Sequence, residues 1–273
     1  DFCLWEYEPL CAPDGKMRSI NLLNNTFEST AVDTEKALEL CQNIREQLGV
    51  NQSVWGVKNV AGNISWELYF YDYERLERKV SISRLLEILK PEINCPLHFD
   101  EDKPYFMFSI DLTPESINQS SNLDEINIYI GNVSTAVSSG ISYTLSDEGL
   151  KLGNLYYFFD RQAHWDDIIG KMACSAHLNL PHIEIASLLW PELTDCQTIV
   201  VANKKHNDGL YFSRINIDQL IIFLKKCDYP ASIIDYTEKN RDQLDHMLYD
   251  VGIDYIMKDG KISILKSAYY GFF

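Results

Sequence analysis

The sequence predicts an α+β fold in which about ten antiparallel strands form five hairpins that close into a barrel with helices packed outside. Apolar and polar side chains alternate along segments of strand length. Turn residues such as Asp-Gly lie between the two segments of each pair, as in a hairpin. Amphipathic helical segments stand between most of the pairs. Ten meandering strands are more than an open twisted sheet comfortably holds, so we expect one barrel domain over residues 1–273. Two α+β subdomains divided near residues 133–139 are the alternative.

The N-terminal half begins with residues 1–30, where Cys, Pro, Gly and Asn occur without a sustained period, which predicts an irregular segment. A helix follows between Asp33, a suitable N-cap, and Gly49, a typical stop. A shorter helix ends before Pro91 and carries one apolar stripe, formed by Ile82, Leu85, Leu86 and Leu89. The predicted strands of this half are 54–59, 64–73, 105–112 and 125–130, the first two joined through Ala61-Gly62-Asn63.

The C-terminal half predicts three further hairpins, because turn residues recur at Asp147-Glu148-Gly149, Asn207-Asp208-Gly209 and Asp259-Gly260. Apolar residues at helical spacing predict a helix over 165–176, a second one capped by Asn216, and a third around Leu244 that ends at Gly252. The predicted strands of this half are 141–145, 152–159, 198–203, 210–215, 253–257 and 261–270.

The strand over residues 64–73 has two chemically different faces. One face is apolar, whereas the other carries Ser65, Glu67, Tyr69, Tyr71 and Tyr73. A solvent-facing strand more usually carries Lys, Thr and Glu, so the tyrosines indicate a lined interior. The strands 105–112 and 125–130 repeat this pattern. We therefore expect the apolar sets to face the helices, namely Trp66, Leu68, Phe70, Phe106, Phe108, Ile110, Ile126, Ile128 and Ile130.

The charge balance of 40 acidic against 24 basic residues gives a net charge of −16, which repels phosphate backbones and anionic lipid. We therefore expect neither nucleic acid nor a membrane as a partner. No apolar run reaches the roughly 18 residues of a membrane-spanning helix. The seven cysteines are odd in number and scattered, which indicates reduced thiols and a cytoplasmic location.

Standard catalytic signatures are missing from the sequence, which has no G-x-S-x-G elbow, no phosphate-binding Gly-rich loop, no H-E-x-x-H and no C-x-x-C. The nearest approach to a metal cluster is Cys174 with His177 and His182. Since no second Cys/His pair accompanies them, a core thiol and surface imidazoles are the simpler interpretation, and we predict no metal site.

The polar strand faces supply the candidate site residues. Glu67 and Asp111 are candidate proton acceptors, since a carboxylate among aromatic rings can take a proton. Tyrosine faces can hold a carbocation, and the candidates for this role are Tyr69, Tyr71, Tyr129 and Tyr211. Cations on strands need a partner such as a buried carboxylate or a diphosphate, and these cations are Lys58, Lys204, Arg214 and Lys266. The alternative is that the tyrosines coat half-exposed sheets while the cations pair with the surplus acids.

Two environments are open for Glu67. Surrounding tyrosine rings would desolvate its carboxylate and raise its pKa towards neutrality. Pairing with a strand cation such as Lys58, across the first hairpin, would instead favour the charged form and lower the pKa.

The repeated hairpin-plus-helix units, the tyrosine-rich strands and the isolated strand cations resemble the ABBA, or prenyltransferase-barrel, class of aromatic prenyltransferases. Two local runs support the comparison, 210–213 before a helix and 251–255 followed by Asp259-Gly260-Lys261-Ile262. The resemblance implies that an allylic diphosphate ionises inside the barrel, held by the basic residues and shielded by the tyrosines, while an acid assists an aromatic small-molecule or peptide acceptor. Mg²⁺ accompanying the diphosphate is the one cofactor that the resemblance suggests. The chain shows fewer strand cations than these enzymes, and single rather than paired helices.

Two other functions are compatible with the same residues. A non-catalytic binding protein could hold a ligand in its aromatic cavity or a protein partner on its acidic surface. An acidic inhibitor that docks on a basic protein would explain the charge of −16 best and the tyrosine strands least.

Overall fold

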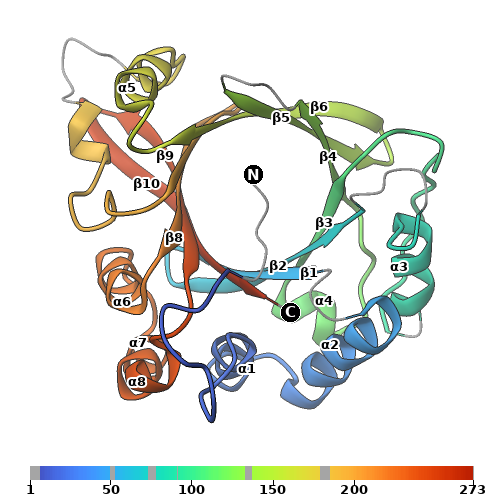
Figure 1. The fold of residues 1–273 in the computed structure, drawn as a ribbon. Coiled ribbons are helices and arrows are strands. Elements are labelled where there is room, and N and C mark those ends of the chain that lie inside the picture. Colours follow the sequence, from blue (N-terminus) through green and yellow to red (C-terminus); the bar gives the residue numbers. More distant parts are fainter. Residues whose placement is uncertain are drawn as a thin grey trace.

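Within residues 7–49, 53–72, 78–90, 92–132, 137–178 and 185–272, which the computed structural model describes, ten antiparallel strands close into one barrel (Figure 1). The predicted barrel is thereby confirmed, and its strands follow one another in the order β1-β10-β9-β8-β7-β6-β5-β4-β3-β2. The strands are β1 (Ser53–Val60), β2 (Asn63–Tyr71), β3 (Met107–Leu112), β4 (Ile126–Asn132), β5 (Ser138–Ser146), β6 (Gly149–Asp160), β7 (Thr198–Asn203), β8 (Asp208–Ile215), β9 (Tyr249–Lys258) and β10 (Lys261–Phe272).

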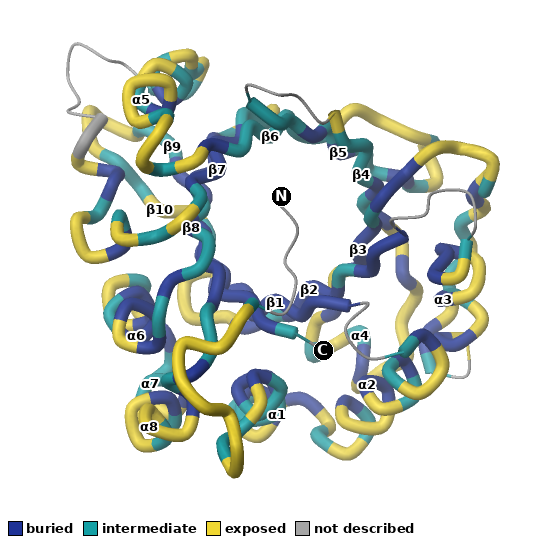
Figure 2. The backbone as a smooth tube through the Cα atoms, viewed as in Figure 1, coloured by how far each residue is buried: buried dark blue, intermediate teal, exposed yellow. Residues whose placement is uncertain are grey.

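Helices pack against the outside of the barrel (Figure 1). Their inward sides are buried and their outward sides exposed (Figure 2). None of the described helices has the length and apolar composition that crossing a bilayer requires. The helices are α1 (Ile20–Glu28), α2 (Thr34–Leu48), α3 (Ile82–Leu89), α4 (Pro114–Asn118), α5 (Trp165–Ala173), α6 (Ile217–Lys226), α7 (Ala231–Lys239) and α8 (Arg241–Leu244), with a 3₁₀ turn at Ile185–Leu188.

Tight turns set the register of the first and last hairpins. Between β1 and β2, Ala61 and Gly62 both have positive φ, 50° and 88°, and Val60 pairs with Asn63. Positive φ at both central residues is the geometry of a type I′ turn, whose twist matches that of the strands. The turn between β9 and β10 is built in the same way from Asp259 and Gly260.

The apolar strand faces pack outward, as predicted for seven of the nine residues named above. Trp66 is 1% exposed, donates its indole N–H to Oγ1 of Thr26 over 2.8 Å, and lies 4.9 Å from the ring of Phe27 on α1. Burying an aromatic side chain of this size stabilises the fold by about 2 kcal/mol or more. One apolar core between barrel and helices thus forms from the outward-facing strand residues and the inward faces of the helices.

Phe106 is a correction, because its side chain lies inside the barrel with Val54, Tyr71 and Tyr270. The strand begins two residues later than predicted, and Phe106 and Met107 both line the lumen, so the alternation breaks between them. Tyr105 instead points outward, where the guanidinium of Arg78 lies 3.7 Å from its ring centroid. Ile130 is half-buried and does not belong to the outer core.

The segment 1–30 is not irregular throughout, because α1 covers Ile20–Glu28. Its buried stripe consists of Leu22, Leu23, Thr26 and Phe27. The helix was not predicted because the Asn-Asn-Thr run at 24–26 has low intrinsic helix propensity. Tertiary packing overrides this propensity.

The helix predicted around Leu244 and ending at Gly252 is wrong in its second half. α8 stops at Leu244, and β9 already begins at Tyr249. Val251 and Ile253 face the outer core, while Asp250 and Asp254 alternate with them, which is the period of a strand.

Candidate functional site in the barrel lumen

The polar strand faces converge inside the barrel. Glu67 on β2 is 6% exposed and Ser109 on β3 is 1% exposed, although both are polar. Tyr69 and Tyr129 lie in the same layer, with ring centroids 6.1 Å apart. The predicted lined interior is therefore present, whereas Tyr73 lies outside the described residues.

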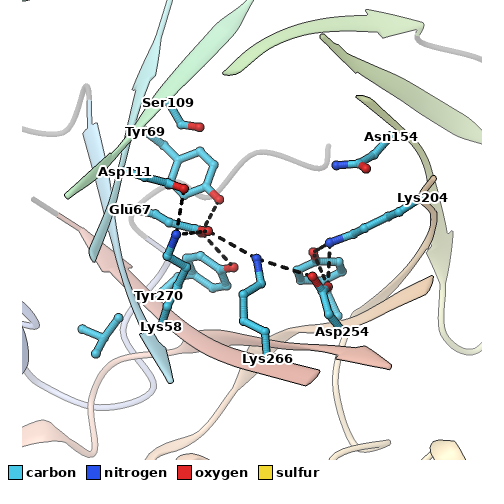
Figure 3. A network of polar contacts seen from close by, with 12 residues as sticks. Lys58, Glu67, Tyr69, Ser109, Asp111, Asn154, Lys204, Asp254, Lys266 and Tyr270 are labelled. Carbon is cyan, nitrogen blue, oxygen red and sulfur yellow. Dashed lines mark hydrogen bonds and ion pairs between the residues drawn. The ribbon is translucent and has the colours of Figure 1, made fainter. Parts of the chain in front are cut away.

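Alternating charges cross one level of the lumen, which we call the charged floor (Figure 3). Three lysines and three carboxylates from β1, β2, β3, β9, β10 and the end of β7 form it, so that its formal charge is balanced. Each lysine therefore already has a partner, which offsets part of its desolvation. The ion pairs run in the order Asp111–Lys58 (2.8 Å), Lys58–Glu67 (3.4 Å), Glu67–Lys266 (3.4 Å), Lys266–Asp254 (3.5 Å) and Asp254–Lys204 (2.6 Å).

Five tyrosines encircle the lumen next to the charged floor, and we call them the tyrosine belt. One comes from each of β2, β4, β6, β8 and β10. Hydroxyls of the belt reach the floor: those of Tyr69 and Tyr270 donate to Glu67 over 2.6 and 3.3 Å. Neighbouring ring centroids lie 5.9 to 6.4 Å apart, in the order Tyr270, Tyr69, Tyr129, Tyr156 and Tyr211.

Glycines on the intervening strands make room for two belt residues. A Cβ atom on Gly56 of β1 would lie 2.6 Å from Cε1 of Tyr270, and one on Gly252 of β9 would overlap the ring of Tyr211. Glycine inside a strand often marks such a close approach. The belt therefore depends on glycines in β1 and β9 as well as on its own tyrosines.

A cavity of about 120 Å³ lies on the other side of the belt from the charged floor. That volume is on the scale of the roughly 150 Å³ cavity known to admit benzene. Its wall is mostly apolar. It carries polar groups at one end of the barrel, which we call the mouth. The belt closes it on one side, and the mouth residues are Tyr71, Phe106, Thr198, Ser213 and Asp250.

Glu67 pairs with lysines rather than remaining alone among the tyrosines. Burial would raise the pKa of its carboxyl, but Lys266, Lys58 and the hydrogen bond from Tyr69 outweigh burial and hold the pKa below its usual range. Of the two environments considered for Glu67, the lysine-paired one is present, and the carboxylate is charged.

Asp111 differs from Glu67, although both contact Lys58. Partial burial and the charge of Glu67 raise the pKa of Asp111, against the opposing effect of Lys58. Its side chain is 48% exposed, so water reaches the charged floor at Asp111. Environments that separate the pKa values of two neighbouring carboxylates are typical of sites that move protons.

Four tyrosines of the belt are held in their protonated form. Burial, reinforced by nearby carboxylates or phenols, raises the pKa of Tyr69, Tyr129, Tyr211 and Tyr270 well above its ordinary value. A neutral phenol keeps the negative quadrupole of its ring face without becoming a strong nucleophile, so the belt can stabilise a nearby cation.

Arg214 lies apart from the other three predicted cations. It occupies a bulge of β8, with a φ of 65°, and its backbone N–H donates to Oδ1 of Asp250 over 2.8 Å. Its guanidinium contacts Gln197 and the ring of Tyr7 at the mouth. Lys58, Lys204 and Lys266 thus share the floor, and Arg214 belongs to the mouth.

The prediction missed Tyr156, Tyr270, Asp250 and Asp254 as site residues. Asp250 was missed because the first part of β9 was read as a helix, whereas Asp254 lay within the predicted strand 253–257 and was not singled out. Gly252 between them was the available signal, since a glycine within an alternating strand indicates close approach of another group. Among the residues that the structure describes, no group of three His, Cys, Asp or Glu side chains is arranged to hold a metal ion, and His182 lies outside them.

No protein-family model matches this chain, and no curated protein sequence matches it. The site's own geometry therefore carries the functional argument.

Proposed function

We propose that the protein transfers a prenyl group from an allylic diphosphate to an aromatic small molecule or peptide inside the barrel. The observation that carries this proposal is the tyrosine belt placed directly between a lysine-containing floor and a largely apolar cavity. A cationic intermediate, an anionic leaving group and an apolar acceptor need these three environments side by side.

In the proposed reaction the bond between C1 of the prenyl group and the diphosphate oxygen breaks, and the diphosphate leaves with the electron pair. Lys58, Lys204 and Lys266 stabilise its negative charge. The tyrosine belt shields the allylic cation until the acceptor attacks C1 and forms the new bond. The acceptor then loses a proton to a carboxylate. Of the two acids predicted for this step, Asp111 has the raised pKa and is the stronger base.

The balanced floor sets a condition on diphosphate binding. The lysines are paired with carboxylates, so a diphosphate has to displace them or arrive with a counter-ion. Asp111 is the floor carboxylate that reaches water, and it would hold a Mg²⁺ ion that enters with the diphosphate, in which case Glu67, the other predicted acid, would accept the proton. Mg²⁺ commonly binds through one or two carboxylates together with phosphate oxygens and water, which this single exposed carboxylate fits.

The direct test is to incubate the purified protein with dimethylallyl, geranyl or farnesyl diphosphate and a panel of phenols, indoles and aromatic peptides. Acceptor-dependent release of pyrophosphate and a matching mass increase of the acceptor are expected. Glu67→Gln and Asp111→Asn should each lower the rate while the protein stays folded, and the loss should be larger for the residue that accepts the proton. If none of the diphosphates binds or reacts, with and without Mg²⁺, prenyl transfer is wrong.

A non-catalytic binding protein is the second candidate, and the balanced charge of the floor favours it. A net-neutral, aromatic interior suits a neutral or zwitterionic aromatic ligand without any leaving group. Native mass spectrometry separates the two functions: a binder would retain such a ligand unchanged, whereas a transferase would release a product of higher mass.

A further inference from the structure

Tyr7 occupies the mouth of the barrel. Its hydroxyl donates to Oδ2 of Asp250 over 2.7 Å and lies 3.2 Å from Oγ of Ser213. The guanidinium carbon of Arg214 lies 4.6 Å from the centroid of its ring, and the ring of Phe272 meets it nearly edge-on at 5.8 Å. Every part of the phenol, its hydroxyl and its ring, therefore has a partner from β8, β9 or β10.

The barrel strands build these partners independently of Tyr7. Asp250 is 6% exposed and its Oδ1 accepts the backbone N–H of Arg214, which leaves Oδ2 directed at the phenol. The bulge at Arg214 fixes both this N–H and the position of the guanidinium. Asp250 and Ser213 also line the cavity, so this group of side chains is continuous with the space next to the tyrosine belt.

The segment that carries Tyr7 is attached elsewhere. Leu10 donates its N–H to the carbonyl of His246, and Met17 donates to that of Gln243, both in or after α8. Lys16 pairs with Asp245 in the same region. Tyr7 could therefore leave the mouth while the rest of this segment keeps its contacts.

We propose that Asp250, Ser213, Arg214 and Phe272 form a phenol-binding subsite that Tyr7 occupies in cis, and that a phenolic ligand, such as a tyrosyl side chain of a peptide, binds there in its place. That this ligand is the prenyl acceptor rests on the proposed function, whereas phenol binding itself does not.

The chemistry of the subsite selects a phenol over other aromatic groups. A buried carboxylate accepts hydrogen bonds but cannot donate them when charged, so it needs an O–H or N–H from the ligand. A guanidinium over a ring face favours an electron-rich ring. A benzyl side chain would fill the same space and leave Asp250 without its hydroxyl partner, and sites built around such a hydrogen bond discriminate strongly against the analogue that lacks it.

Binding of N-acetyl-tyrosinamide and N-acetyl-phenylalaninamide, measured by calorimetry, tests the proposal without any diphosphate. Tyr7→Ala removes the competing phenol and should bind N-acetyl-tyrosinamide about tenfold or more tightly than the wild type. The phenylalanine analogue should bind at least about tenfold more weakly than the tyrosine compound. Adding Asp250→Ala to Tyr7→Ala should abolish this preference, because the carboxylate that accepts the phenol hydroxyl is then gone.

Tyr236→Ala, on the outer helix α7, is the matched control and should leave the affinity of the wild type unchanged. If Tyr7→Ala does not fold, Tyr7→Phe keeps the ring and loses only the hydroxyl, and an affinity gain of about threefold is expected. Unchanged affinity in the folded Tyr7 variant, or equal binding of the two compounds, overturns the subsite. Phenol binding without prenyl transfer would refute only the proposed function, and transfer to phenols with unchanged affinity in Tyr7→Ala would refute only the subsite.

Discussion

The ring of Tyr270 covers Gly56 across the β1–β10 pair, so that a Cβ atom on the glycine would lie 2.6 Å from Cε1 of the tyrosine. Tyr211 covers Gly252 in the same way across the β8–β9 pair. These contacts fix two members of the tyrosine belt, and they link the shape of the lumen to two residues that have no side chain.

Gly252→Ala should therefore destabilise the protein by about 1 to 3 kcal/mol, because the new methyl group forces Tyr211 out of its position. The hydrogen bond between Nζ of Lys204 and the hydroxyl of Tyr211, 3.0 Å long, would be strained as well. Urea denaturation measures the change. The control is Gly170→Ala on the exposed side of α5, where a Cβ meets open space and helix propensity predicts a gain of about 0.5 to 1 kcal/mol. Equal effects of the two changes would contradict the packing described for Tyr211.

Phe106 and Phe108 provide a second test, because they stand on opposite sides of the barrel wall. Phe108 is fully buried in the outer core, so Phe108→Ala should lower the free energy of unfolding by about 3 to 5 kcal/mol. Phe106 lines the cavity, and Phe106→Ala should cost less stability while enlarging the space for an aromatic ligand. Chemical denaturation combined with ligand-binding calorimetry distinguishes them, and the reverse order of stability losses would mean that the two faces are exchanged.

The strands of the barrel could be predicted from local patterns, because apolar and polar side chains alternate within each strand independently of the others. Trp66, Leu68 and Phe70 had to face a helix layer once Glu67 and Tyr69 faced inward. The same rule failed at Phe106, which precedes its strand and is placed by backbone hydrogen bonds to Asp72 and Tyr129. Such bonds depend on the pairing of distant segments, which one sequence does not display.

The candidate site was predictable only in its parts. The residue types at Lys58, Lys204 and Lys266 indicated inward cations, but their meeting depends on the register of β1 and β10 and on barrel closure. Arg214 had the same local appearance, yet a bulge turns it to the mouth. Bulges shift side chains without a reliable sequence signal. The separation of Arg214 from the lysines could therefore be recognised only in the structure.

Glu67→Gln should destabilise the protein by about 1 to 3 kcal/mol at neutral pH, since Lys58 and Lys266 each lose one of two carboxylate partners. The pKa of Glu67 is lowered in the folded state, so its stabilisation is present above the unfolded pKa of about 4.3 and is lost as the pH falls further. The stability gap between wild type and variant should thus be constant from about pH 5 to 8 and shrink below about pH 4.

Guanidinium denaturation at several pH values measures this gap. Glu238→Gln, which removes an exposed partner of Lys225, is the control and should change stability by less than about 0.5 kcal/mol. A gap that widens on acidification would mean that Glu67 has a raised pKa and is not held in its charged form by the lysines.

Lys266 is the central cation of the charged floor, 3.4 Å from Glu67 and 3.5 Å from Asp254. Its side chain is 26% exposed, more than that of Lys58 or Lys204, so it is the floor lysine that we expect a diphosphate to contact first. Lys266→Gln should weaken the binding of inorganic pyrophosphate by about 10- to 100-fold, which is the contribution expected of one charge-assisted hydrogen bond. The fold should survive, because Glu67 keeps Lys58 and Asp254 keeps Lys204 as partners.

Calorimetry with pyrophosphate measures the loss, and Lys266→Arg should restore part of the affinity. Lys225→Gln on the outer surface removes the same charge and should leave pyrophosphate binding unchanged. Equal losses in the two glutamine variants would show that pyrophosphate responds to the overall charge of the protein and not to the floor, and the lysines would then have no assigned ligand.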